Sequence, residues 1–121
     1  MIVVERTDFV SVPVQDLARA ERFYGETLGL RRSKGEAGAF AEFETGNLTF
    51  LLFDPSALGR EVAPYGGPIA LRVPDVDAAR TELELAGVAF NGGVIDSGVC
   101  QMALFEDSEG NALMLHRRYA D

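Results

Sequence analysis

The stretch VPVQDLARAERFYGETLGL, Val12–Leu30, decides the fold because it joins a strand-like run to a helix-like run. It starts with a short apolar run typical of a strand, and apolar residues then recur at the helical spacing of three and four. Asp16 lies between the two runs and suits the N-cap, where a carboxylate accepts from a free amide of the first turn. Gly29 suits the left-handed residue that ends a helix. We therefore predict a strand followed by a helix near Asp16–Leu28.

The second half of the chain repeats this pattern in LRVPDVDAARTELELAGVAF, Leu71–Phe90. Asp75 corresponds to Asp16, and the apolar residues around both match at the same offset. A repeat of this length indicates two copies of one supersecondary unit, each unable to bury its apolar face alone. The second copy therefore predicts a helix near Asp75–Ala86.

Three strand-like runs follow each predicted helix, separated by Gly-rich turns. They are Leu30–Lys34, Phe40–Glu44 and Leu48–Phe53 in the first copy, and Val88–Gly92, Val99–Phe105 and Ala112–Arg117 in the second. The order is βαβββ twice, which predicts an α+β fold. We predict one domain over residues 1–121, with module one at 1–53, a linker at 54–66 and module two at 67–121.

Alternation along the strands predicts which side chains face away from the helices. A sheet covered by helices on one side is apolar on that side, so the β-branched Val10, Val12 and Val14 should face the helix. The residues between such positions should form an open face of mixed polarity, which is typical of a ligand cleft. The predicted ligand-binding residues are Phe9, Ser11, Leu51, Phe53, Arg72, Met114 and His116.

Composition excludes several classes of partner. The net charge of −8 argues against nucleic acid, which needs clustered Lys and Arg. No apolar run approaches the ~18 residues of a membrane span, and the start MIVVERTD lacks the pattern of a secretory signal. A single cysteine excludes an internal disulfide and fits a reducing compartment. We expect a cytoplasmic protein without nucleic-acid or membrane partners.

Three stretches resemble those of one known family, and one of them is the repeat segment LRVPDVDAARTELELAGV. VQDLARAERFYGETLGL resembles V-x-D-L-x-x-(A/S)-x-x-F-Y-x-x-x-L-G-L, and FEDSEGNALML resembles F-x-D-P-x-G-N-x-x-E-L, both from the vicinal oxygen chelate (VOC) superfamily. This is also called the glyoxalase/bleomycin resistance protein/dioxygenase family. Ser108 stands where the family commonly has proline. The resemblance covers nearly the whole chain and implies two modules forming a cupped mixed sheet around a cleft, and a homodimer.

The resemblance also implies where a metal would bind. Enzymes of the family usually hold a metal with His or Glu at four positions of the concave face, which fall here on Phe9, Leu51, Pro68 and Met114. None of these side chains binds a hard or borderline divalent cation, because such sites need imidazole or carboxylate and thioethers suit soft metals. We therefore predict no metal and no cofactor.

The resulting functional hypothesis is a metal-free protein that binds a small organic molecule, as in drug or toxin sequestration by bleomycin resistance proteins. The alternative is a glyoxalase-like lyase or isomerase, or a dioxygenase-type enzyme. A metal-independent enzyme with His116 as general base also stays open, so no catalytic residue is assigned. Arg72 has two readings, a contact to an acidic ligand or a salt bridge to a glutamate across the sheet.

Overall fold

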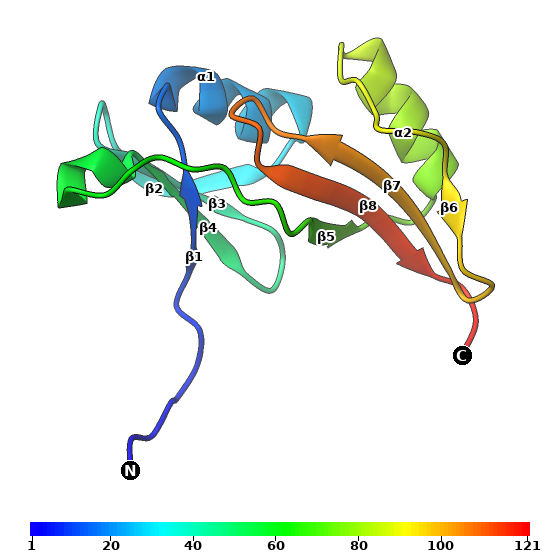
Figure 1. Cartoon of the computed structure of the whole chain (residues 1–121), viewed down its shortest axis with the longest axis horizontal. Coiled ribbons are helices and arrows are strands. Elements are labelled where there is room, and N and C mark those ends of the chain that lie inside the picture. The colour runs from blue at the N-terminus through cyan, green and yellow to red at the C-terminus, as the bar shows by residue number, and fades with distance from the viewer. The chain divides into compact units, whose positions relative to one another are not determined.

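The computed structural model describes all 121 residues and confirms the α+β class with two βαβββ modules (Figure 1). The chain divides into two compact units, Met1–Ala63 and Pro64–Asp121. The first contains β1 (Val10–Pro13), α1 (Leu17–Arg22), η1 (Phe23–Thr27), β2 (Arg31–Glu36), β3 (Phe40–Glu44), β4 (Thr49–Phe53) and η2 (Pro55–Leu58). The second contains β5 (Ile69–Arg72), α2 (Val76–Leu85), β6 (Ile95–Asp96), β7 (Cys100–Glu106) and β8 (Ala112–Arg118). No helix combines the length and the hydrophobicity that a membrane crossing requires.

Each unit forms its own four-stranded mixed sheet with equivalent topology. The strand order is β1-β4-β3-β2 in the first unit and β5-β8-β7-β6 in the second. The first strand of each unit pairs in parallel with the last, and the remaining pairs are antiparallel. The parallel pair needs a long crossover connection, which the helix and the two middle strands supply.

The predicted helix caps are present in both units. Asp16 accepts a hydrogen bond from the amide of Arg19 at 3.1 Å, and Asp75 accepts from the amide of Ala78 at 3.0 Å. The predicted first helix changes to π geometry after Arg22, where the amide of Leu28 donates to the carbonyl of Phe23 at 2.9 Å. The caps therefore start both helices where the sequence indicated.

The core of the first unit lies between its helical segment and one face of its sheet. Tyr24 is fully buried and packs edge-on against Phe50, with ring centroids 5.9 Å apart. Val12 and Val14 are fully buried as well, as predicted for the core-facing residues, whereas Val10 at the start of β1 is half-buried. A Cβ at Gly25 would lie 3.2 Å from the Phe43 ring, so glycine lets the helix approach the sheet closely.

The core of the second unit uses the same alternation. Its buried hydrophobic residues are Val76, Leu83, Ala103, Phe105, Leu113 and Leu115. On β7 and β8 they alternate with partly exposed residues. Consequently Met114 and His116 lie on the face opposite this core, as the strand pattern predicted.

The predicted strand at Val88–Gly92 is wrong. Only an isolated bridge forms there, between Phe90 and Phe105, and the strand itself is the two-residue β6. Gly92 has a positive φ of 77°, a conformation that turns the chain away from the sheet before it returns at Ile95. Short apolar runs flanked by glycine carry too little information to fix such a boundary.

Candidate functional site

The open face of the second sheet is a set of cross-strand rows. Arg72 lies opposite His116, which lies opposite Met102, and Met102 lies opposite Ile95. This row crosses all four strands in the order β5, β8, β7, β6. Cross-strand neighbours on one face lie close enough for their side chains to contact. The row therefore presents two basic groups beside two apolar ones.

The adjacent row on this face is apolar. Met114 lies between Ala70 on β5 and Leu104 on β7. One step further along the strands, Glu106 lies opposite Ala112 and is exposed. The face thus changes from basic at Arg72 to acidic at Glu106.

Arg72 is exposed and forms no ion pair in the structure. The predicted alternative of a salt bridge to a glutamate across the sheet is therefore wrong, because the neighbour across the sheet is His116. A guanidinium without a carboxylate partner remains available for an anionic group.

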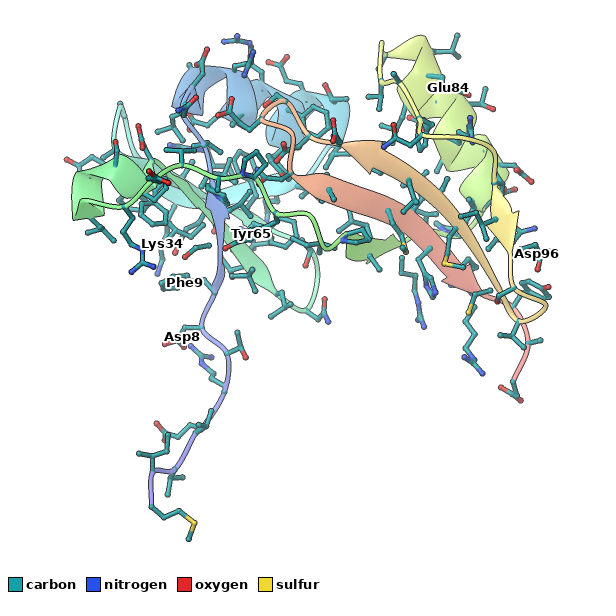
Figure 2. The ribbon with its side chains drawn as sticks, in the orientation of Figure 1. Asp8, Phe9, Lys34, Tyr65, Glu84 and Asp96 are labelled. Atoms are coloured by element: carbon teal, nitrogen blue, oxygen red, sulfur yellow. The ribbon has the colours of Figure 1, made fainter.

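The predicted residues of the first unit also share the open face of their sheet. Ser11 lies opposite Leu51, and Phe53 lies next to Pro13 in the parallel pair. Phe9 precedes β1 and is 45% exposed, at the point where the extended N-terminal segment meets the sheet (Figure 2). The row through Leu51 continues to Glu42 and Lys34. Sequence reasoning missed these two, although Glu42 alternates with the buried Ala41 and Phe43.

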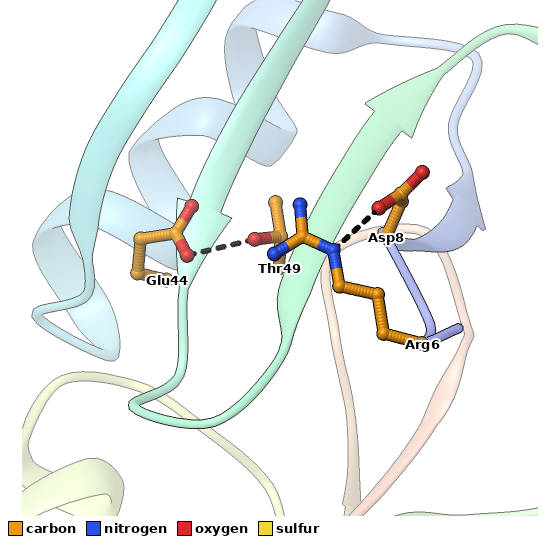
Figure 3. A network of polar contacts seen from close by, with 4 residues as sticks. All are labelled: Arg6, Asp8, Glu44 and Thr49. Carbon is orange, nitrogen blue, oxygen red and sulfur yellow. Dashed lines mark hydrogen bonds and ion pairs between the residues drawn. The ribbon is translucent and has the colours of Figure 1, made fainter.

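Glu44 forms a polar network at the end of this face. Its carboxylate accepts from the hydroxyl of Ser33 at 2.5 Å and from that of Thr49 at 2.7 Å, as Figure 3 shows for Thr49. These hydrogen bonds, that of Ser33 first, lower the pKa of Glu44 below its ordinary value of 4.5. Arg6 and Asp8 form an ion pair before β1, with 2.9 Å between Nε and Oδ1, and Figure 3 shows this pair as well. The lowered pKa favours the ionised form of the Glu44 carboxylate.

The turn between β7 and β8 contains a buried polar clamp. Asp107 accepts from the amides of Glu109 at 2.8 Å and Asn111 at 2.9 Å, which confirms the predicted turn. The Asn111 side chain donates to Asp107 at 2.9 Å and accepts from the amide of Tyr65 at 2.9 Å. The amide of Ala112 in turn donates to the Tyr65 carbonyl at 2.8 Å. The clamp therefore fixes the segment around Tyr65 beside the start of β8.

A cavity of about 350 Å³ lies next to this clamp, wholly within the second unit. It is lined by Pro64, Tyr65, Gly66, Pro68, Asn91, Leu104, Phe105, Glu106, Gly110, Ala112 and Leu113. Arg72, Met114 and His116 do not line it, but Leu104 and Ala112 adjoin Met114 on the open face. No local pattern of the sequence indicates this cavity, because its wall depends on the contact between Tyr65 and Asn111.

The residues that the resemblance places at the family's metal positions do not fit a hard or borderline metal ion. Phe9 and Leu51 of the first unit and Pro68 of the second carry no donor atom, and Met114 carries only a thioether. No group of three or more His, Cys, Asp or Glu side chains is placed to hold a metal. No catalytic step is therefore assigned to such an ion.

Comparison with solved structures finds the same fold in proteins of different function. TnmS3, an antibiotic binding protein from Streptomyces sp. CB03234, is 26% identical with a TM-score of 0.81, over 98% of this chain and all of that chain (100%). A glyoxalase/bleomycin resistance protein from the same organism is 30% identical with a TM-score of 0.70, over 88% and 96%. The lactoylglutathione lyase of Agrobacterium tumefaciens is 22% identical with a TM-score of 0.79, over 94% of each chain, and shows the fold alone.

A family model also matches the sequence itself. The model describes the Glyoxalase/Bleomycin resistance protein/Dioxygenase superfamily and matches residues 6–115. This match includes both helices and every strand up to the middle of β8. The protein therefore belongs to the Glyoxalase/Bleomycin resistance protein/Dioxygenase superfamily, the VOC superfamily to which its repeated motifs pointed.

Proposed function

We propose that this protein binds a small organic molecule without a hard or borderline metal ion, as a drug- or toxin-sequestering protein. The observation that carries the proposal is the set of residues at the family's metal positions, three of which have no donor atom at all. An antibiotic binding protein with the same fold, 26% identical to this chain, supports binding as the activity.

The ligand proposed is flat or partly aromatic and carries at least one acidic or acceptor group. Met114, Leu104 and Ala70 offer an apolar surface in one row, while Arg72 and His116 offer donors in the next. The net charge of −8 favours cations at long range, but exposed charges are screened over about 8–10 Å. The unpaired guanidinium of Arg72 is in direct reach of a ligand on this face, so its positive charge favours an acidic ligand over a cationic one.

For the first unit by itself, the proposed ligand contacts are Phe9, Ser11, Leu51 and Phe53. Leu51 and Phe53 are half-buried on the open face of β4, and Ser11 supplies a hydroxyl on the neighbouring strand. Apolar walls with few polar anchors are the usual composition of small-molecule sites.

A lyase, isomerase or dioxygenase is the second candidate, because the lyase from Agrobacterium tumefaciens shares the fold. In that chemistry a metal polarises a carbonyl or an enolate. The residues that would hold the metal are replaced here, so we place this candidate below binding. An enzyme that uses His116 as a general base would need no metal, and conversion of a screened ligand would reveal it.

Two measurements separate these candidates. Metal analysis of protein purified without chelators should find well under one equivalent of Zn, Ni, Mn or Fe. A thermal-shift screen of small aromatic acids should then find ligands, and incubation of each ligand with the protein should leave it chemically unchanged. One equivalent of a divalent metal, or conversion of a ligand, would replace the binding proposal with the enzymatic one.

Arg72 is the residue whose role can be tested directly. Arg72→Ala should weaken binding of an acidic aromatic ligand by roughly 1.5–3 kcal/mol, the range for hydrogen bonds to charged groups, with little change in thermal stability. The matched control is Arg117→Ala, one residue after His116 on the opposite face of β8. Calorimetry that finds equal affinities for both variants would remove Arg72 from the site.

We further propose that the protein works as a homodimer in the cytoplasm. The dimer follows from the family resemblance, in which pairing commonly completes the cleft. The single cysteine, which allows no internal disulfide, fits a reducing compartment. A molecular mass in solution that stays at that of one chain over a wide concentration range would contradict the dimer.

A further inference from the structure

The soft donor atoms of this chain are concentrated on one face of two neighbouring strands. The sequence contains one histidine, one cysteine and three methionines. Four of these five residues, all except Met1, lie on the open face of β7 and β8: Cys100, Met102, Met114 and His116. The alternation of both strands places them there together, opposite the buried set of Ala103, Phe105, Leu113 and Leu115.

The strand register brings these donors within reach of one point. Met102 lies directly opposite His116, and such pairs have Cβ atoms about 4.5–5.5 Å apart. Cys100 is the diagonal neighbour of His116, and Met114 is the diagonal neighbour of Met102, at about 7–8 Å. Methionine and histidine side chains are long enough to bridge these separations. An ion bound over the Met102–His116 pair can therefore be reached by the Cys100 sulfur on one side and by the Met114 sulfur on the other.

The donors are also available. Each of the four residues is half-buried, so an ion can reach them while the sheet shields part of the site. Cys100 is a free thiol, and the His116 ring has no hydrogen-bond partner in the structure. The nearest carboxylate on this face, Glu106, is paired with Ala112, two steps along β7 from Met102.

The chemistry of this donor set selects the metal. Thioether and thiolate sulfur with imidazole suit Cu(I) and similar soft ions, whereas Mg²⁺ and Ca²⁺ need oxygen. Zn²⁺ sites use thiolate, imidazole and carboxylate, usually four of them, and only Cys100 and His116 qualify here. Arg72 and Arg118 border the site and are exposed. Their positive charge opposes a hard divalent cation more than a monovalent ion bound through polarisable sulfur.

We propose that Cys100, Met102 and His116 bind one Cu(I) ion, with the Met114 thioether as an additional donor. Of these four residues, only Met114 occupies a position at which the family places a metal ligand. The proposal is independent of the organic ligand proposed above. An organic molecule lying on the same rows would compete with the ion.

The test is a titration of the full-length protein with Cu(I) under reducing, anaerobic conditions against a chromogenic Cu(I) chelator. We expect one equivalent to bind. Loss of an outer-shell partner commonly costs a metal site about 10–100-fold in affinity, so loss of a ligand should cost at least about tenfold. Met102→Leu and His116→Gln should each show that loss, while Gln101→Leu, on the opposite face of β7, should not.

A second measurement needs no variant. Ag(I) mimics Cu(I) without redox chemistry, and its addition should shift the methyl NMR signals of Met102 and Met114 but not that of Met1. Binding that Cys100→Ser abolishes and that Met102→Leu and His116→Gln leave unchanged would be attachment to a lone thiol and would overturn the proposal. Unshifted methionine methyls, or equal affinity for Zn²⁺, would overturn it as well.

Discussion

The buried side chain of Asn111 provides the sharpest test of how this fold holds its second unit together. Asn111 is fully buried and joins the turn before β8 to the segment around Tyr65. It donates to the Asp107 carboxylate and accepts from the Tyr65 amide, each at 2.9 Å. Asn111→Ala removes both hydrogen bonds and leaves the Tyr65 amide without this partner.

The expected magnitude follows from these two contacts. A hydrogen bond to a charged group contributes about 1.5–3 kcal/mol and a neutral one about 0.5–1.5 kcal/mol, so the variant should lose about 2–4.5 kcal/mol of unfolding free energy. For a chain of this length, that loss corresponds to a decrease in Tm of about 8–18 °C.

The assay is chemical and thermal denaturation of the variant beside a matched control. Asn91→Ala removes an exposed asparagine that lines the same cavity, and it should change stability by no more than about 0.5 kcal/mol. If the unfolding free energies of the two variants differ by less than about 1 kcal/mol, the clamp does not stabilise the unit and the reasoning is wrong.

Three further predictions concern single polar groups. The Ser108 hydroxyl is buried without a hydrogen-bond partner, so Ser108→Ala should stabilise the protein by about 1 kcal/mol in denaturant titrations, and a loss of stability would reveal a hidden partner. Because the pKa of Glu44 is lowered in the folded state, its contribution to stability is present above pH 4.5 and is lost as the pH falls through the folded-state pKa. Thr49→Val should raise that pKa in carboxyl NMR titrations and make the loss of stability at low pH smaller. The hydroxyl of Tyr119 donates to Asp96 at 2.6 Å, and this hydrogen bond is the largest cause of the lowered pKa of Asp96. In the same titrations, Tyr119→Phe should therefore raise the pKa of Asp96 and leave that of Glu44 unchanged.

Much of the candidate site could be predicted from strand alternation. The pattern ALMLH placed Met114 and His116 on one face, because successive side chains of a strand point to opposite sides. The same rule applied to CQMALFE would have found Met102 and Leu104, whose importance only became evident from the pairing of β7 with β8. The alternation of a strand, and the face on which each side chain lies, are set by neighbouring residues. The residue that lies opposite on the next strand is not set locally.

The sequence by itself determined the βαβββ order, the two capped helices and the strand alternation that separates a core face from an open face. These features depend on interactions within a few residues, such as the Asp16 and Asp75 caps. Only the tertiary structure decided that Arg72 faces His116 and lacks a carboxylate partner, and that Asn111 holds Tyr65, which is 46 residues away along the chain. Such contacts join segments far apart in sequence. Their formation depends on register and on the packing of the whole unit, which no local pattern encodes.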